Sequence, residues 1–152
     1  MNTQQDIIDI FSILHDGTIE SWTGNKEKLL LKVGCLYLAE LIDKDFECFY
    51  VEVEQIKKIE FFAWMNPIDQ EQKIFTELEE IFKTELEILS AEKSEDDILI
   101  VCNQHDTAFE YCGGKLTINC ESIKIFDERH NILKIDEFDK ICKQYWDKCG
   151  RN

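Results

Sequence analysis

The chain has 152 residues, 44% of them apolar and 11% aromatic, which predicts a single domain (residues 1–152) with its own hydrophobic core. Its 32 acidic and 17 basic residues give a formal net charge of −15, and this charge disfavours binding to nucleic-acid phosphates. The apolar run 98–102 is far shorter than the ~20 residues of a membrane span, and residues 1–6 lack the pattern of a signal peptide. We therefore expect a cytoplasmic protein that binds neither nucleic acid nor a membrane.

The first third of the chain predicts a helical segment followed by a β-hairpin. Residues 5–14 combine Ile, Leu and Phe with two Asp, which fits a short helix or a helix that runs into a strand. His15-Asp16-Gly17 indicates a turn. Side chains of residues 19–23 alternate between two faces, as in a strand, and a returning strand is expected at 28–34. Thr23-Gly24-Asn25-Lys26 between them is typical of a hairpin connection.

Two strands and a helix are expected in the middle of the chain. Residues 36–42 indicate a short helical or irregular stretch, and residues 46–54 and 59–64 predict two adjacent antiparallel strands. Asn66-Pro67 is expected to open a mid-chain helix with an apolar stripe toward the sheet and a polar side toward solvent. The stripe comprises Ile74, Phe75, Leu78, Ile81 and Phe82, and the polar side comprises Gln70, Glu71, Glu77, Glu79 and Glu80.

The last third predicts further antiparallel strands. Residues 87–93 and 97–103 flank an acidic turn as a hairpin, and the run 98–102 suggests a central strand buried on both faces. Gly113-Gly114 begins another pair of strands. The apolar residues lie at even-numbered positions up to Cys120 and at odd-numbered positions from Ile123. A bulge or turn near Glu121-Ser122 is therefore expected to absorb this shift.

A final helix completes the predicted fold. Asp136 can cap this helix, in which Phe138, Ile141, Cys142, Tyr145 and Cys149 form one apolar stripe. The whole pattern predicts an α+β fold, mainly an antiparallel sheet or sandwich-like, with one mid-chain helix and one C-terminal helix packed on it.

The cysteines indicate reduced thiols. They are odd in number, contain no CxxC pair and mostly occupy apolar positions: Cys35, Cys48, Cys102, Cys112, Cys120, Cys142 and Cys149. His105, Cys112 and Cys120 are ligand types that zinc accepts, but their spacing does not bring them together. We expect neither a metal nor another cofactor.

His15 and Asp16 form a doublet that invites comparison with acid–base or metal groups. The chain contains no HxxxH or HExxH arrangement to supply further ligands. A structural turn, in which Asp16 accepts backbone hydrogen bonds before Gly17, is the favoured interpretation. No catalytic residue is assigned, and enzymatic activity is not the favoured reading.

Trp22 and the acidic group Glu95, Asp96 and Asp97 are the candidate partner-binding residues. Trp22 lies opposite the apolar face of its predicted strand, and exposed Trp side chains contribute strongly to binding when they fill a pocket of the partner. The acidic group lies at the tip of a predicted hairpin and lacks the ligand spacing of a calcium loop.

The order of features resembles small bacterial domains of unknown function, some of which are similar to immunity proteins of polymorphic toxin systems. The resembling stretches are 14–19, 29–33, 61–64 and 123–146. The resemblance implies a compact α+β or sandwich-like fold and a role in blocking a toxin by binding it. It carries over no catalytic residues.

The leading hypothesis is a non-enzymatic protein-binding domain, an acidic immunity-like inhibitor of a basic protein. The alternative is a small enzyme or ligand-binding domain with a pocket near His15 and Asp16. A structural or assembly subunit is a third possibility. The sequence makes no prediction of the oligomeric state.

Overall fold

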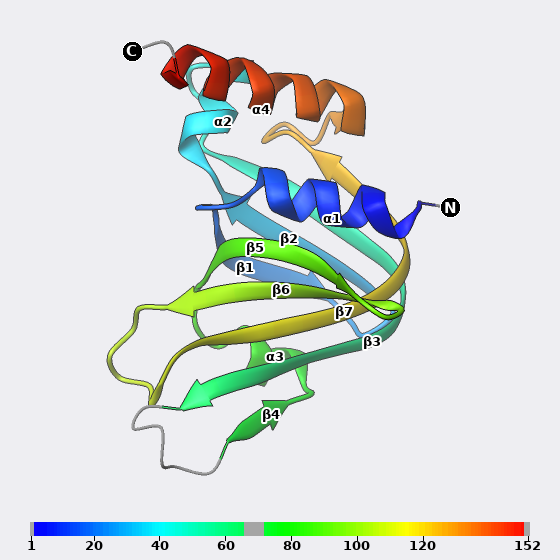
Figure 1. Cartoon of the computed structure of the whole chain (residues 1–152), viewed down its shortest axis with the longest axis vertical. Coiled ribbons are helices and arrows are strands. Elements are labelled where there is room, and N and C mark those ends of the chain that lie inside the picture. Colours follow the sequence, from blue (N-terminus) through cyan, green and yellow to red (C-terminus); the bar gives the residue numbers. More distant parts are fainter. Residues whose placement is uncertain (1, 66–71, 151–152) are drawn as a thin grey trace.

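The structure, a computed structural model, describes residues 2–65 and 72–150, with side chains through Lys148 (Figure 1). It is an α+β fold in which four helices accompany a large antiparallel sheet. The helices are α1 (Gln4–Ile13), α2 (Leu36–Ile42), α3 (Leu78–Ile81) and α4 (Ile135–Gly150). The strands are β1 (Thr18–Gly24), β2 (Lys28–Gly34), β3 (Cys48–Met65), β4 (Lys73–Phe75), β5 (Leu86–Ser94), β6 (Asp97–Gln104), β7 (Tyr111–Phe126) and β8 (Ile132–Leu133).

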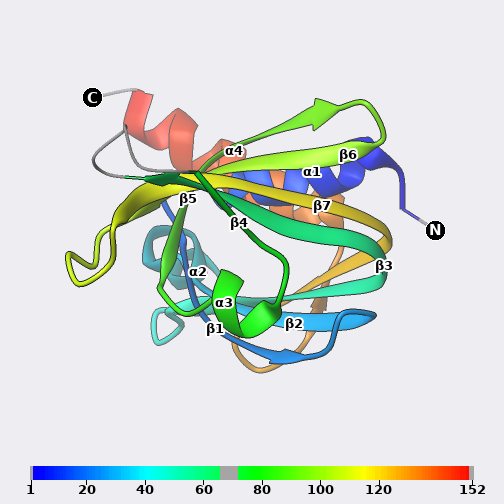
Figure 2. The same ribbon diagram turned by 90° about the horizontal axis from the view of Figure 1, so that it is seen from below.

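The sheet closes on itself. Its strand order is β4-β3-β2-β1-β5-β6-β7-β8, every pairing is antiparallel, and β3 also pairs with β7. Strands β1, β2, β3, β7, β6 and β5 therefore form a closed ring. Figure 2 shows how strongly β3 and β7 curve to complete it. The prediction of a mainly antiparallel α+β fold is confirmed.

The elements of the first third agree closely with the predictions. Helix α1 ends at Ile13, so of the two alternatives for residues 5–14 the short helix is right. Thr3 caps the start of this helix. Thr3 Oγ1 accepts a hydrogen bond from the Asp6 backbone N–H at 3.1 Å, and the Asp6 carboxylate accepts one from the Thr3 N–H at 3.0 Å. This reciprocal pair satisfies two backbone donors that the first turn of a helix leaves free. The predicted hairpin is also present, and residues 36–42, expected to be helical or irregular, form a helix.

The prediction of two separate strands at 46–54 and 59–64 is wrong, because β3 is one continuous strand of 18 residues. Its register against β7 shifts between Ile56 and Lys58, and Gln55 has a positive φ of 54°. The phase change predicted near Glu121-Ser122 therefore needs no turn. β7 remains continuous, and the irregularity lies in its partner strand, where it bends the pair.

The predicted mid-chain helix is also wrong. Residues 73–75 form strand β4 on the edge of β3, and the helical part is the four-residue α3. The aromatic ring of Phe75 lies parallel to that of Phe61, with centroids 6.3 Å apart. This packing on β3 favours a strand over a helix for residues 73–75. The predicted start at Asn66-Pro67 lies outside the described residues, as do Gln70 and Glu71.

One hydrophobic core fills the space between the curved sheet and the helices. In β6 the burial alternates, with Ile98, Ile100 and Cys102 buried and Leu99 and Val101 half-buried. The strand does lie between two others, β5 and β7, but the prediction that both of its faces are buried is wrong.

Helices α1 and α4 lie on the same side of the sheet (Figure 1). Phe138 of α4 is fully buried and meets Phe49 of β3 edge-on, with centroids 5.1 Å apart. Ile141, Cys142 and Tyr145 are partly buried against the core, as predicted for the apolar stripe, and the Cys149 side chain lies outside the described residues. None of the helices in the described ranges combines the length and apolar composition needed to span a bilayer.

Candidate functional site

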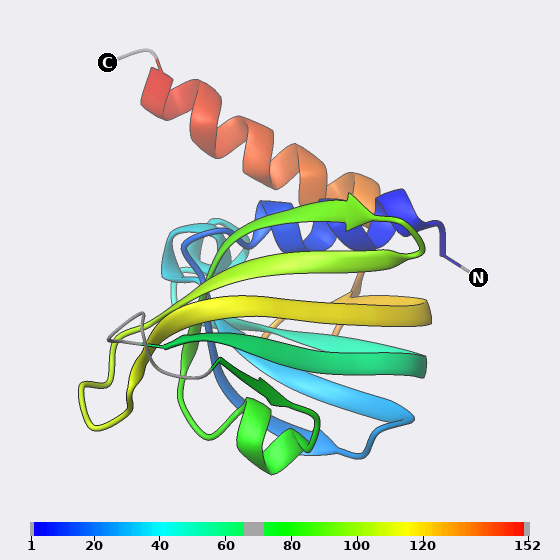
Figure 3. The same cartoon turned by 60° about the horizontal axis from the view of Figure 1, so that its bottom comes forward.

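A cleft lined by one of the predicted binding residues lies between the β1–β2 hairpin and α3. It has a volume of about 480 Å³ and lies beside Trp22. Figure 3 shows α3 next to the two blue strands of this hairpin. The lining residues are Trp22, Gly24, Asn25, Lys26, Glu27, Glu77, Leu78 and Glu79. We call this the Trp22 cleft.

Trp22 forms an aromatic wall of the cleft. Its side chain is half-buried, because the indole packs against Phe82 with centroids 6.3 Å apart and an interplanar angle of 39°. The ring is thus held in place and still accessible from the cleft. An aromatic ring held in this way loses little side-chain entropy when a ligand covers it.

The hairpin turn that borders the cleft has a defined geometry. Gly24 has a φ of +112°, and a Cβ at this position would overlap the carbonyl oxygen of Lys28. The Asn25 side-chain oxygen accepts hydrogen bonds from the backbone N–H groups of Glu27 at 2.8 Å and Lys28 at 3.0 Å. These contacts fix the direction in which Lys26 and Glu27 leave the turn.

The cleft is acidic. Glu27, Glu77 and Glu79 contribute three carboxylates and Lys26 contributes one ammonium, which leaves a formal charge of −2. Lys26 Nζ lies 2.9 Å from Glu77 Oε1 and so neutralises part of this charge, while Glu27 and Glu79 are exposed to solvent. A cleft with an accessible indole and excess carboxylate suits an ammonium or guanidinium group.

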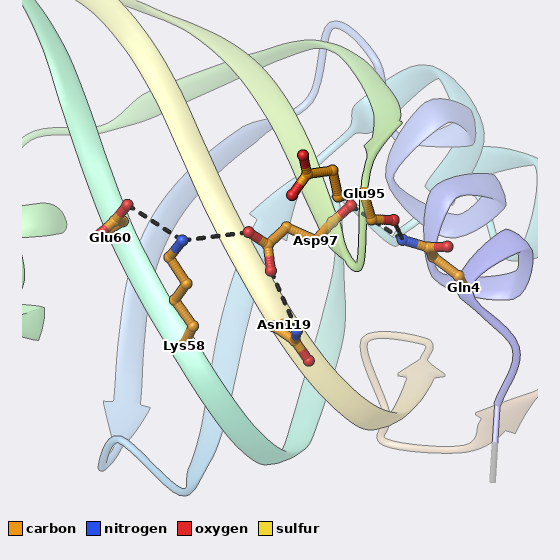
Figure 4. Close-up of polar contacts among 6 residues, drawn as sticks. All are labelled: Gln4, Lys58, Glu60, Glu95, Asp97 and Asn119. Carbon is orange, nitrogen blue, oxygen red and sulfur yellow. Dashed lines mark hydrogen bonds and ion pairs between the residues drawn. The ribbon is translucent and has the colours of Figure 1, made fainter.

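The acidic hairpin predicted as a binding element is present, but its three carboxylates have different surroundings. Figure 4 shows two of these residues, Glu95 and Asp97, with their polar contacts. Glu95 and Asp96 form the exposed turn, and Glu95 has a φ of 57°. Gln4 Nε2 donates hydrogen bonds to the backbone oxygens of Glu95 and Asp97, both at 3.1 Å. The turn is therefore tied to the start of α1.

The Asp97 carboxylate makes contacts with neighbouring strands of the sheet. Its carboxylate accepts hydrogen bonds from Lys58 Nζ at 3.2 Å and from Asn119 Nδ2 at 3.1 Å. The hydrogen bond and charge of Asp97, with a smaller contribution from Glu60, raise the pKa of Lys58. Asp97 thus connects β6 to β3 and β7, and the exposed acidic charge of this hairpin comes from Glu95 and Asp96.

The Trp22 cleft and the acidic hairpin belong to the same end of the molecule. A second cleft of about 330 Å³ is lined by Lys26 and Glu27 of the first hairpin and by Lys57 and Lys58 of β3. Lys58 in turn contacts Asp97. Figure 3 shows both hairpin tips on one side of the sheet, with the bend of β3 and β7 between them. The tip of the β1–β2 hairpin, which borders the Trp22 cleft, and the tip of the acidic β5–β6 hairpin therefore lie on the same side of the sheet.

His15 and Asp16 occupy the predicted turn. Asp16 has a φ of 67°, and its backbone N–H donates to the carbonyl oxygen of Ile88 at 2.7 Å. Within residues 2–65 and 72–150 the Asp16 carboxylate accepts no backbone hydrogen bond, contrary to the prediction, and backbone hydrogen bonds close the turn instead. His15 Nδ1 lies 2.8 Å from the Ser12 carbonyl oxygen, and Trp146 stacks on its imidazole with centroids 5.4 Å apart.

Neither His15 nor Asp16 lines the Trp22 cleft or the second cleft beside Lys57 and Lys58. His15 Nε2 and Asp16 Oδ2 are 4.0 Å apart, too far for a hydrogen bond. The stacked imidazole instead helps to hold α4 against the end of α1. The alternative pocket near His15 and Asp16 stays a prediction from the sequence.

The cysteines are mostly covered by the core. Cys35, Cys48 and Cys102 are buried, and burial raises the pKa of the Cys102 thiol to about 12. Cys112 is exposed. Residues 2–65 and 72–148 contain no group of three His, Cys, Asp or Glu side chains arranged to hold a metal ion. His105 lies beside Glu87, with its Nε2 3.3 Å from the carboxylate.

Sequence reasoning missed the contribution of Glu77 and Glu79. Both were assigned to the solvent side of a mid-chain helix, whereas in the structure Glu77 precedes α3, Glu79 lies in its first turn, and both line the cleft beside the β1–β2 hairpin. The long-range pair Lys26–Glu77 brings these segments together, and no local pattern in the sequence reports such a contact.

Comparison with protein-family models, with curated proteins and with solved structures gives no match for this chain. The resemblance to immunity proteins therefore remains a prediction from the sequence.

Proposed function

We propose that this protein is a non-enzymatic binding protein, an acidic immunity-like inhibitor that blocks a basic protein in the cytoplasm by binding it. The observation that carries the proposal is the Trp22 cleft, where an accessible indole lies beside three carboxylates and one lysine. Such a cleft suits a lysine or arginine side chain of the partner. The cation would lie over the indole face and be paired with Glu77 or Glu79.

The charge of the whole chain supports the same partner. A formal net charge of −15 creates a negative field that attracts a basic protein and raises the rate of encounter. Glu95 and Asp96, exposed on the neighbouring hairpin tip, add to this field on the same side of the molecule. Asp97 contributes less, because Lys58 and Asn119 already occupy its carboxylate.

The two parts of the surface have separate roles in this proposal. The exposed carboxylates at the rim steer association, which depends on long-range charge. Trp22 provides the contact that is lost last during dissociation, because buried aromatic anchors contribute most of the binding energy of an interface. The partner's basic side chain displaces Lys26 from Glu77 or binds beside it.

A matched pair of charge variants tests the proposal. The protein is used to capture partners from its native organism, in parallel with Glu77→Gln/Glu79→Gln and with Glu40→Gln/Glu137→Gln. Each double variant removes two exposed carboxylates, so the two have the same net charge. One dominant basic protein should be recovered by the wild type and by the control variant, and much less of it by the cleft variant.

Equal recovery of that protein by both double variants would show that net charge alone causes binding and would exclude the cleft. Recovery of an acidic protein that depends on the cleft would contradict the assignment of a basic partner. The captured protein is then assayed for an activity that decreases when the purified inhibitor is added, which tests inhibition separately from binding.

A further inference from the structure

A lysine of this protein lies inside a cage of aromatic rings. Lys83 Nζ is 4.4 Å from the centroid of Phe75, 5.5 Å from that of Phe109 and 5.8 Å from that of Tyr111. The three rings come from β4, from the loop that precedes β7 and from β7 itself. All three distances fall within the ~6 Å range of a cation–π interaction.

The rings are held in place by contacts that do not involve Lys83. Fully buried Phe61 packs against two of them, with its centroid 6.3 Å from Phe75 and 5.9 Å from Tyr111. Tyr111 is itself buried, and its hydroxyl lies 3.3 Å from Thr84 Oγ1. Phe109 packs on Tyr111 at 6.1 Å. The cage is therefore expected to keep its shape when the lysine side chain leaves.

Lys83 is attached much less firmly than the rings. Its side chain is 31% exposed, and its carboxylate partner, Glu80, is more than half exposed at 3.1 Å. Exposed ion pairs of this kind contribute little to stability. A cleft of about 230 Å³ lies beside the ammonium and is lined by the three rings together with Met65, Lys73, Lys83, Ala108 and Glu110.

We propose that this aromatic cage is a binding site for a quaternary or fully methylated ammonium group, and that Lys83 occupies it as an internal ligand in the free protein. A primary ammonium has three N–H donors that ring faces satisfy poorly, which is why Lys83 keeps its contact with Glu80. A methylated ammonium has none of these donors and is less strongly hydrated. It therefore gains more from the ring faces and displaces Lys83.

The site is independent of the Trp22 cleft, with which it shares no lining residue. Its ligand is defined by the cationic head group. Both a free quaternary amine and a trimethylated lysine in a peptide carry this group, so the experiment includes one ligand of each kind.

Titration with tetramethylammonium, followed by NMR of the Phe109 and Tyr111 ring protons, tests the site. Lys83→Met removes the internal cation and retains an apolar stem of similar size, so this variant should bind about tenfold more tightly than the wild type. Lys83→Gln serves as a second variant, and near-UV circular dichroism verifies that each variant retains its tertiary packing. Adding Phe109→Leu to Lys83→Met should remove most of the gain.

The comparison of choline with its uncharged analogue 3,3-dimethylbutan-1-ol separates charge recognition from apolar binding. Choline should bind to Lys83→Met and the alcohol should bind at least about tenfold more weakly. A trimethyl-lysine peptide that binds more tightly than choline would identify a protein ligand, and the reverse order a free amine. No binding by either folded Lys83 variant, equal binding of the alcohol, or equal affinity in the wild type and Lys83→Met would overturn the proposal.

Discussion

Lys26 Nζ lies 2.9 Å from Glu77 Oε1, and this ion pair joins the turn of the β1–β2 hairpin to the segment that enters α3. Both side chains are more than half exposed, so the pair is well solvated. It forms one border of the Trp22 cleft and also holds a carboxylate that the proposed basic partner needs. The pair is thus a contact that a stronger cationic ligand can replace.

Glu77→Gln should lower the free energy of unfolding by less than about 1 kcal/mol, because an exposed ion pair contributes little. Urea denaturation of the variant and the wild type measures this difference. A small effect means that loss of partner binding in Glu77→Gln reflects the cleft itself. A loss of several kcal/mol would mean that the pair is a structural element, and binding data from the variant would not report on the interface.

Phe138→Ala should lower the free energy of unfolding by about 3–5 kcal/mol, because the ring is fully buried and packs edge-on against Phe49. Ile132→Ala is the matched control, since Ile132 is 62% exposed and its truncation should have little effect. The denaturation midpoints of both variants provide the comparison. Similar midpoints would show that α4 is not docked through Phe138.

Asp97→Asn should lower stability by about 1 kcal/mol, because it removes the charge that holds Lys58 and Asn119 across three strands. Asp96→Asn, on the exposed turn one residue earlier, should be nearly neutral. Chemical denaturation of both variants distinguishes a carboxylate of the fold from one available to a partner. Equal stabilities would mean that Asp97 is as free as Asp96.

Stability should decrease in alkaline solution. Burial raises the pKa of Cys35 and Cys48 to about 11 and that of Cys102 to about 12, whereas their ordinary pKa is 9.0. Above about pH 9 the unfolded chain loses thiol protons that the folded chain keeps, so the free energy of unfolding falls as pH rises toward these folded-state values. Below about pH 9 these thiols have no effect.

Cys102→Ala tests this dependence, since it removes the thiol with the highest of these pKa values. The free energy of unfolding of the variant should fall less steeply between about pH 9 and pH 11 than that of the wild type, by up to about 1.4 kcal/mol per pH unit. Parallel pH profiles for the two proteins would show that the Cys102 thiol ionises equally easily in the folded and unfolded states.

Local sequence patterns predicted the elements whose contacts are local. The strand at 28–34 was predicted with the bounds that the structure has, because alternation and turn residues there agree with the packing. Residues 36–42, expected to be helical or irregular, form a helix over the same range. The prediction of a mid-chain helix was wrong because a contact with a distant part of the chain decides the structure there. Ile74 and Phe75 fit a helical stripe, but the contact of Phe75 with Phe61 on β3 places them in a strand.

The closure of the sheet and the Trp22 cleft depend on long-range contacts. The pairing of β3 with β7 joins residues such as Tyr50 and Phe126, which are remote in the sequence. Trp22 could be singled out because it lies opposite the apolar face of its predicted strand. Glu77 and Glu79 could not, because their role depends on the position of α3 beside the first hairpin.

The dissociation rate of the captured basic partner from Trp22→Ala tests the central claim most directly. If the indole anchors the partner, this variant should dissociate about 30-fold faster than the wild type, the effect of losing a contact worth about 2 kcal/mol. Its association rate should stay close to the wild-type rate and fall with added salt in the same way, since the carboxylates that steer the encounter remain. Biolayer interferometry measures both rates. An unchanged dissociation rate, in a variant shown to be folded, would contradict the assignment of the Trp22 cleft as the binding site.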